Sequence, residues 1–185
     1  DPKLEITCMN GEMCIRESGS EEGAKEPVAH PGAKIKEILK EYTSPKVKDL
    51  PSFTGGLVGY FSYDYVKYSE PKLNLDADDQ EGFKDVDLML FDKVIAFDNL
   101  RQKIYIIANA RTEDLEQEYD RCLAEIEEIV DLIEHGTPAQ ITPGKITSEF
   151  RPLFSEQEYC AMVEKAKHYI YEGDIFQVVL SNRLE

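Results

Sequence analysis

The sequence predicts an α+β protein in which antiparallel strands build the sheet and helices lie on the outside. Three observations support this fold class. Short segments with alternating apolar residues follow one another closely, with turn residues such as Asn-Gly between them. Longer segments repeat their apolar residues at helical spacing, and no internal repeat is present. We therefore expect strands grouped into an antiparallel sheet that is covered by helices.

The expected strands begin with a hairpin at the start of the chain. Leu4–Cys8 and Met13–Arg16 alternate apolar and polar residues, and the Asn-Gly pair between them is typical of a two-residue type I′ turn. In this register Cys8 faces Met13, so Cys8 and Cys14 lie on opposite faces and cannot form a disulfide. The other expected strands are Thr54–Phe61, Asp87–Phe91, Lys93–Phe97 and Lys103–Asn109.

The first two expected helices are marked by their ends. One begins at Pro31, which suits a first helical turn, and ends before Ser44-Pro45. The other begins at an N-cap residue, Thr112, and runs to Glu134, with Gly136 as its stop. The buried stripe expected for this second helix is Leu115, Tyr119, Cys122, Leu123, Ile126 and Ile129.

The last part of the chain predicts a helix followed by a buried strand. Ser155 and Glu158 have the spacing of a capping box, and Gly173 supplies the left-handed residue that ends a helix. Ile175–Ser181 is an almost continuous apolar run, which is typical of a strand covered on both faces. Gln177 interrupts it, and a buried amide there either is bonded within the protein or faces a cavity. The apolar stripe of the helix is Tyr159, Met162, Val163, Ala166 and Ile170.

The composition excludes some classes of function. A formal charge of −16 argues against nucleic acid as a partner, because a polyanion would be repelled. No apolar run is long enough for a membrane span or a secretory signal, so no membrane partner is expected. The four cysteines have no CxxC spacing and the three histidines are dispersed. We expect reduced thiols, a cytoplasmic location and no metal site.

Two further patterns have a structural and a functional interpretation. The glycines between Thr54 and Phe61 match neither a dinucleotide nor a P-loop spacing, so we interpret them as sites of close backbone approach in a strand. The tyrosines between Tyr60 and Tyr68 are interpreted as core residues with hydroxyls bonded at the rim, rather than as a ligand site.

The chain is expected to be a fragment of a longer protein. Asp1-Pro2 is no natural start, and the last strand pattern is still running at Glu185. The stretch from Thr137 to Ser148 contains two prolines and is the expected linker. We assign residues 1–143 to one domain, incomplete at its start, and residues 144–185 to a linker and the first helix and strand of a second, truncated domain.

Several stretches together resemble anthranilate synthase component I, one of the chorismate-utilising enzymes. The stretches that carry the resemblance are Pro51–Tyr60, Ser62–Tyr68, Asp87–Phe91, Ile106–Ala110 and Glu172–Ser181 with Arg183. The related aminodeoxychorismate synthase component I usually has Asn where this chain has Val179, which favours the anthranilate branch. That relative stays open as an alternative, as does a noncatalytic module that binds an effector or a partner subunit.

The resemblance implies a fold and a reaction. The fold would be part of the layered α/β/β/α chorismate-utilising architecture. The parent enzyme, a lyase of tryptophan biosynthesis, would convert chorismate and ammonia to anthranilate and pyruvate with Mg²⁺, and a glutamine amidotransferase subunit would supply the ammonia. The magnesium-binding glutamates of the family lie downstream of Glu185, so the fragment itself is expected to be inactive and to bind no cofactor.

The resemblance also implies one site residue, Gln177, which maps toward the pocket. Related enzymes that add water to chorismate have a lysine there, interpreted as the base that activates water. Ammonia needs no such base, so a neutral amide in a positioning role is chemically reasonable. Tryptophan is a possible feedback inhibitor of the parent, but the family's inhibitor-binding motifs are absent from this sequence, and no inhibitor-binding residue is assigned.

Overall fold

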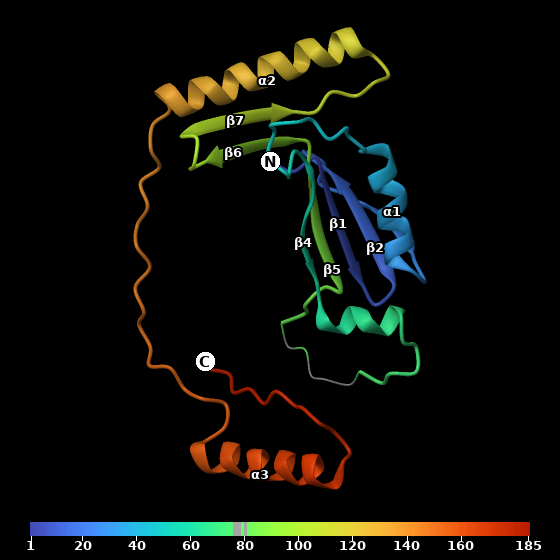
Figure 1. Cartoon of the computed structure of the whole chain (residues 1–185), viewed down its shortest axis with the longest axis vertical. Coiled ribbons are helices and arrows are strands. Elements are labelled where there is room, and N and C mark those ends of the chain that lie inside the picture. The colour runs from blue at the N-terminus through green and yellow to red at the C-terminus, as the bar shows by residue number, and fades with distance from the viewer. Residues whose placement is uncertain (76–78, 80) are drawn as a thin grey trace. The chain divides into compact units, whose positions relative to one another are not determined.

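The computed structural model describes residues 1–75, 79 and 81–185, and the chain forms two compact units (Figure 1). The first unit is Asp1–Thr137 and the second is Pro138–Glu185. The antiparallel sheet with outer helices that the sequence predicts is confirmed, and it lies in the first unit. The family domains 1–143 and 144–185 stay a prediction. No helix among the described residues is long and apolar enough to cross a membrane.

A five-stranded antiparallel sheet is the main element of the first unit, with the strand order β3-β2-β1-β5-β4. Its strands are β1 (Leu4–Met9), β2 (Glu12–Glu17), β3 (Ala24–Pro27), β4 (Gly56–Phe61) and β5 (Val86–Phe91). The central pair, β1 and β5, joins segments about eighty residues apart in the sequence, and Leu4 lies opposite Leu90. Strand β3 is not among the strands that the sequence predicts.

The β1–β2 hairpin has the predicted turn and register. Cys8 pairs with Met13, and both side chains are buried, whereas Cys14 pairs with Thr7 on the other face. Asn10 and Gly11 have φ angles of 50° and 80°, the left-handed pair that a type I′ turn requires. All four cysteines are free.

The core lies on one face of this sheet. Helix α1 (Pro31–Glu41) and the short 3₁₀ helix η1 (Tyr63–Tyr68) supply Ile35, Tyr65 and Tyr68 to it. The aromatic prediction is confirmed for Tyr68, which packs against the core and has a hydrogen-bonded hydroxyl, and its packing part is confirmed for Tyr65. It is wrong for Tyr60 and Tyr63, which are 39% and 89% exposed. The buried residues of this core cluster are Ile6, Cys8, Met13, Ile35, Val86 and Leu88.

A separate two-stranded sheet follows directly after β5. Strands β6 (Lys93–Asp98) and β7 (Lys103–Ala108) form a hairpin, and helix α2 (Leu115–His135) packs along β7 (Figure 1). The predicted N-cap at Thr112 is wrong, because residues 113 and 114 form a turn and Asp114 takes the N-cap position. The Glu118 carboxylate of the first helical turns accepts the backbone N–H of Arg111, just before this turn, at 3.0 Å.

The apolar stripe predicted for α2 is only partly buried. Cys122 is the buried residue of the helix, whereas Leu115, Tyr119 and Leu123 are 60%, 61% and 41% exposed, so the prediction is wrong for these three. The physical reason is that the small β6–β7 sheet covers only the middle of a helix of 21 residues.

The second unit contains helix α3 (Glu156–Glu172) and the segment that follows it. The predicted capping box is confirmed: the Ser155 hydroxyl accepts the Glu158 N–H, and the Glu158 carboxylate accepts the Ser155 N–H at 2.9 Å. Gly173 has a φ of 84°, the left-handed helix end that the sequence predicts.

The predicted buried strand Ile175–Ser181 is wrong in this structure. The segment has no strand hydrogen bonding among the described residues, and Phe176 and Val179 are 93% and 82% exposed. A strand exists only where a neighbour pairs with its backbone. In the second unit that pairing is confined to a bridge between Pro152 and Leu184 and the bonds beside it. The apolar pattern is therefore present without the partner that would turn it into a strand.

Candidate functional site

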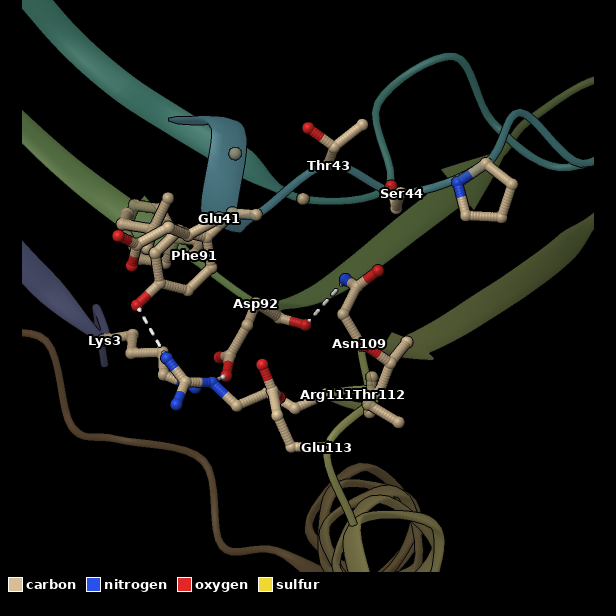
Figure 2. Close-up of a pocket in the computed structure, with 17 residues that line it drawn as sticks. Lys3, Glu41, Thr43, Ser44, Phe91, Asp92, Asn109, Arg111, Thr112 and Glu113 are labelled. Atoms are coloured by element: carbon tan, nitrogen blue, oxygen red, sulfur yellow. Dashed lines mark hydrogen bonds and ion pairs between the residues drawn. The ribbon is translucent and has the colours of Figure 1, made fainter. Parts of the chain in front are cut away.

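The first unit contains a cavity of about 520 Å³ where β5 turns into β6 and β7 ends (Figure 2). Its walls come from the chain start, the end of α1, the beginning of β4 and the segment after β7. The lining residues that bear polar or charged side chains are Lys3, Glu41, Tyr42, Thr43, Ser44, Asp92, Asn109, Arg111, Thr112 and Glu113. No single stretch of sequence contains them, because the topology brings these segments together.

Asn109 holds one wall of the cavity in place. Its side-chain amide donates to the carbonyl oxygens of Thr54 and Asp92, both at 2.8 Å. Its backbone N–H also donates to Asp92, and its carbonyl accepts a hydrogen bond from Arg121 of α2 at 3.2 Å. One asparagine therefore connects the segment before β4, the β5–β6 corner and helix α2.

Two cationic side chains lie over the ring of Tyr42. The Lys3 Nζ and the Arg111 Cζ are each 5.8 Å from the ring centroid, within the range of a cation–π interaction. Lys3 also forms an ion pair with Asp92 at 3.1 Å, whereas the Arg111 guanidinium donates a long hydrogen bond to the Tyr42 hydroxyl at 3.5 Å. Lys3 is thus neutralised locally, and Arg111 supplies the positive charge of this wall.

Two hydrogen-bonded charged groups, Arg111 of the cavity and Glu118 of α2, have shifted pKa values. The hydrogen bond to Tyr42 raises the pKa of Arg111 above its ordinary value. On α2, hydrogen bonds from the Arg121 side chain and then from the Arg111 backbone lower the pKa of Glu118 to about 2. Neither group changes its charge under physiological conditions, so the cavity has no proton donor or acceptor of tuned pKa from these residues.

The hydroxyl groups of the cavity are not paired with a general base among the described residues. Its aliphatic hydroxyl groups, on Thr43, Ser44 and Thr112, form no hydrogen bond to a basic side chain in the described part of the chain, which nucleophilic catalysis would require. The Tyr42 hydroxyl contacts only the Arg111 guanidinium, which is always protonated and is no base. Within residues 1–75, 79 and 81–185 no group of three His, Cys, Asp or Glu side chains could hold a metal ion. The residues described here therefore do not fit a magnesium site.

Gln177, the site residue expected from the sequence, lies in the second unit. It is exposed in the irregular segment after α3, so the expectation of a buried amide is wrong in this structure. Its role in positioning stays a prediction. The sequence did not predict the residues of the cavity. The one feature of the sequence that could have indicated them is that Tyr42, Asp92 and Asn109 directly follow the ends of α1, β5 and β7.

Two curated relatives of this chain share one name, anthranilate synthase component 1. Anthranilate synthase component 1 of Acinetobacter calcoaceticus is 34% identical over 97% of this chain and 36% of its own length. The protein of that name from Aquifex aeolicus is 39% identical over 83% of this chain and 32% of its own length. The chain thus spans about a third of the length of these relatives.

The fold comparison and the family comparison agree with each other. The crystal structure of anthranilate synthase component I from Streptococcus pneumoniae superposes on the whole chain with a TM-score of 0.67 at 22% identity, and the match covers 40% of that protein. A family model described as chorismate binding enzyme matches residues 4–185. Since this match includes almost every residue, the chain belongs to the chorismate binding enzyme family.

Proposed function

We propose that this chain is the N-terminal portion of an anthranilate synthase component I. The single observation that supports this best is the 34% identity to a protein of that name over almost the whole chain. The aminodeoxychorismate alternative is not better supported, because the two curated relatives described above are both named anthranilate synthase component 1. The parent enzyme would convert chorismate and ammonia to anthranilate and pyruvate, in the cytoplasm and within tryptophan biosynthesis.

The reaction explains which parts the parent must add to this chain. A dianionic substrate and a departing hydroxyl group require a divalent cation, here Mg²⁺, and a general acid. Among the described residues no group of three His, Cys, Asp or Glu side chains could hold this cation. We therefore assign the cation and the chemistry to the remainder of the parent, with a glutamine amidotransferase subunit as ammonia source. Tryptophan would act as feedback inhibitor of the parent, and we do not assign the cavity to it.

The first prediction concerns the 185-residue chain by itself. Mixed with chorismate, Mg²⁺ and ammonium, it is expected to form no anthranilate, because it lacks the groups that bind the cation and protonate the leaving hydroxyl. Anthranilate fluorescence measures this directly, with the full-length enzyme as positive control. Product formation by the purified chain at a rate proportional to its concentration would contradict the proposal.

The second prediction concerns Gln177 in the full-length enzyme. If its amide positions the substrate or ammonia, Gln177→Ala and Gln177→Lys lower the ammonia-dependent kcat by about tenfold to a hundredfold, the loss expected from a misplaced reactant. The matched control is Gln157→Ala, because Gln157 is an exposed glutamine in the same unit. Steady-state kinetics with ammonium separate kcat from KM. Unchanged turnover in both Gln177 variants would remove this residue from the site.

A further inference from the structure

Asn10 and Gly11 form the tip of the β1–β2 hairpin and are the only Asn-Gly pair in the sequence. Glycine has no Cβ, so its nitrogen can approach a neighbouring side chain without steric hindrance. Asn10 is also exposed to water. We propose that Asn10 is a deamidation site, and that the folded hairpin protects it by holding the Gly11 amide in a partly buried hydrogen-bond network.

Deamidation at this pair needs no enzyme and no cofactor. The Gly11 backbone nitrogen loses its proton to a solvent base and attacks Asn10 Cγ, so that a nitrogen–carbon bond forms. The Cγ–Nδ2 bond then breaks, and the leaving nitrogen takes a proton from water and departs as ammonia. Water opens the resulting succinimide ring to aspartate or isoaspartate. Two conditions control the rate: the Gly11 amide must ionise, and its nitrogen must reach Cγ.

The structure opposes ionisation of the Gly11 amide. Its N–H donates to the Tyr68 hydroxyl at 2.8 Å, and this hydroxyl donates to the carboxylate of Asp85 at 2.7 Å. Asp85 is only 3% exposed. Burial and the hydrogen bond to Asp85 raise the pKa of Tyr68 well above its ordinary value, so negative charge is disfavoured here. A deprotonated Gly11 amide would lie beside the same Asp85 carboxylate and would be disfavoured for the same reason.

The structure also restricts the movement that ring closure requires. The Asn10 N–H donates to Asp85 at 2.7 Å, and Lys67 donates to the Asn10 side-chain oxygen at 3.0 Å. The Gly11 carbonyl accepts the N–H of Val28 at 2.7 Å. These bonds hold the backbone of Asn10 and Gly11 in its left-handed conformation and fix the position of the Asn10 side chain. The reaction must wait for the turn to open, and its rate reports how often this happens.

The modification would not be neutral for the fold. Aspartate at position 10 would add a negative charge beside Asp85 and Lys67, which already form an ion pair at 2.7 Å. Isoaspartate would lengthen the backbone by one carbon at the tip of a two-residue turn, whose geometry sets the register of β1 and β2. Each opening of the hairpin therefore carries a risk of permanent damage to the sheet.

The experiment measures deamidation during incubation in mildly alkaline buffer, by intact mass and by peptide mapping that distinguishes isoaspartate. A synthetic peptide of residues 4–17 gives the unprotected rate. The folded chain is expected to react about a hundredfold more slowly than the peptide, because the reaction requires local opening. Tyr68→Phe removes the acceptor of the Gly11 N–H and is expected to react about tenfold faster than the wild type, the factor for one lost hydrogen bond.

Tyr63→Phe is the matched control, because Tyr63 lies on the same short helix and is exposed, and its rate is expected to equal that of the wild type. The proposal is overturned if the folded wild type reacts at the peptide rate, or if a folded Tyr68→Phe keeps the wild-type rate. Should Tyr68→Phe not fold, hydrogen exchange of the wild type decides instead. A Gly11 amide that exchanges as fast as an exposed amide overturns the proposal, and a protected one supports it.

Discussion

Replacing Gly59 with alanine is expected to unfold the five-stranded sheet. Gly59 lies in β4 opposite Leu88 and has a φ of 154°, and a Cβ there would lie 2.0 Å from the Asp87 carbonyl oxygen and 2.9 Å from the Leu88 Cα. These atoms belong to the backbone of β5, so no side chain can move aside. We expect a loss of about 4 kcal/mol or more in the free energy of unfolding, from a clash added to conformational strain.

Substitutions at two other glycines distinguish the steric clash from the conformational strain. Gly19 has a φ of 78° but open space around it, so Gly19→Ala tests the conformational strain alone, at about 1 kcal/mol. Gly144 has open space and no left-handed φ, so Gly144→Ala is expected to change stability very little. Urea unfolding followed by circular dichroism measures all three variants. A Gly59→Ala protein as stable as Gly19→Ala would show that β4 and β5 do not approach each other this closely.

The second large effect is expected at Asp85, the buried carboxylate beneath the β1–β2 turn. It accepts hydrogen bonds from Lys67, Tyr68 and the Asn10 N–H, all at 2.7 Å. Asp85→Asn removes the charge that compensates Lys67 and leaves buried donors without a full partner. We expect a loss of about 3 kcal/mol, typical of removing one member of a buried ion pair. Asp87→Asn is the control, because its partner Lys84 is largely exposed and such surface pairs contribute about 0–1 kcal/mol.

The pH dependence of stability gives an independent measurement of the same group. Burial by itself would raise the pKa of Asp85, but the hydrogen bonds from Lys67, Tyr68 and Asn10 outweigh it and lower the pKa below its ordinary 3.8. A lowered pKa in the folded state stabilises the protein above the ordinary value, and this contribution is lost as the pH falls through the folded value. The difference in stability between wild type and Asp85→Asn should therefore shrink below the ordinary pKa. A difference that stays constant on acidification would contradict this assignment.

The sequence predicted those parts of the fold that depend on neighbouring residues. The type I′ turn at Asn10-Gly11, the capping box at Ser155 and the left-handed Gly173 are local arrangements, and the structure confirms all three. The hairpin register followed from the turn, because a two-residue loop fixes which residues face each other.

The predictions that failed depend on distant partners. Ile175–Ser181 has the apolar pattern of a buried strand, but pattern alone does not supply the neighbouring strand that would pair with it. The cavity was missed for a similar reason, because Lys3 and Arg111 meet over Tyr42 only after the strands have assembled. Asn109 also gave no sign of its role, since its bonds reach back to Thr54 and across to α2.

The bonds between Asn182 and Phe154 have a consequence for the freedom of the chain around α3. The Asn182 amide donates to the Phe154 carbonyl and accepts the Phe154 N–H, across a separation of 28 residues. Joining the ends of a loop of this length costs about 3 kcal/mol of entropy. Five hydrogen bonds close its ends, the two of Asn182 and three between the backbones of residues 151–153 and 183–185, and each contributes about 1 kcal/mol net. Removing the two Asn182 bonds should therefore leave the open and closed forms of this loop at similar free energies, so that the end of the polypeptide is released part of the time.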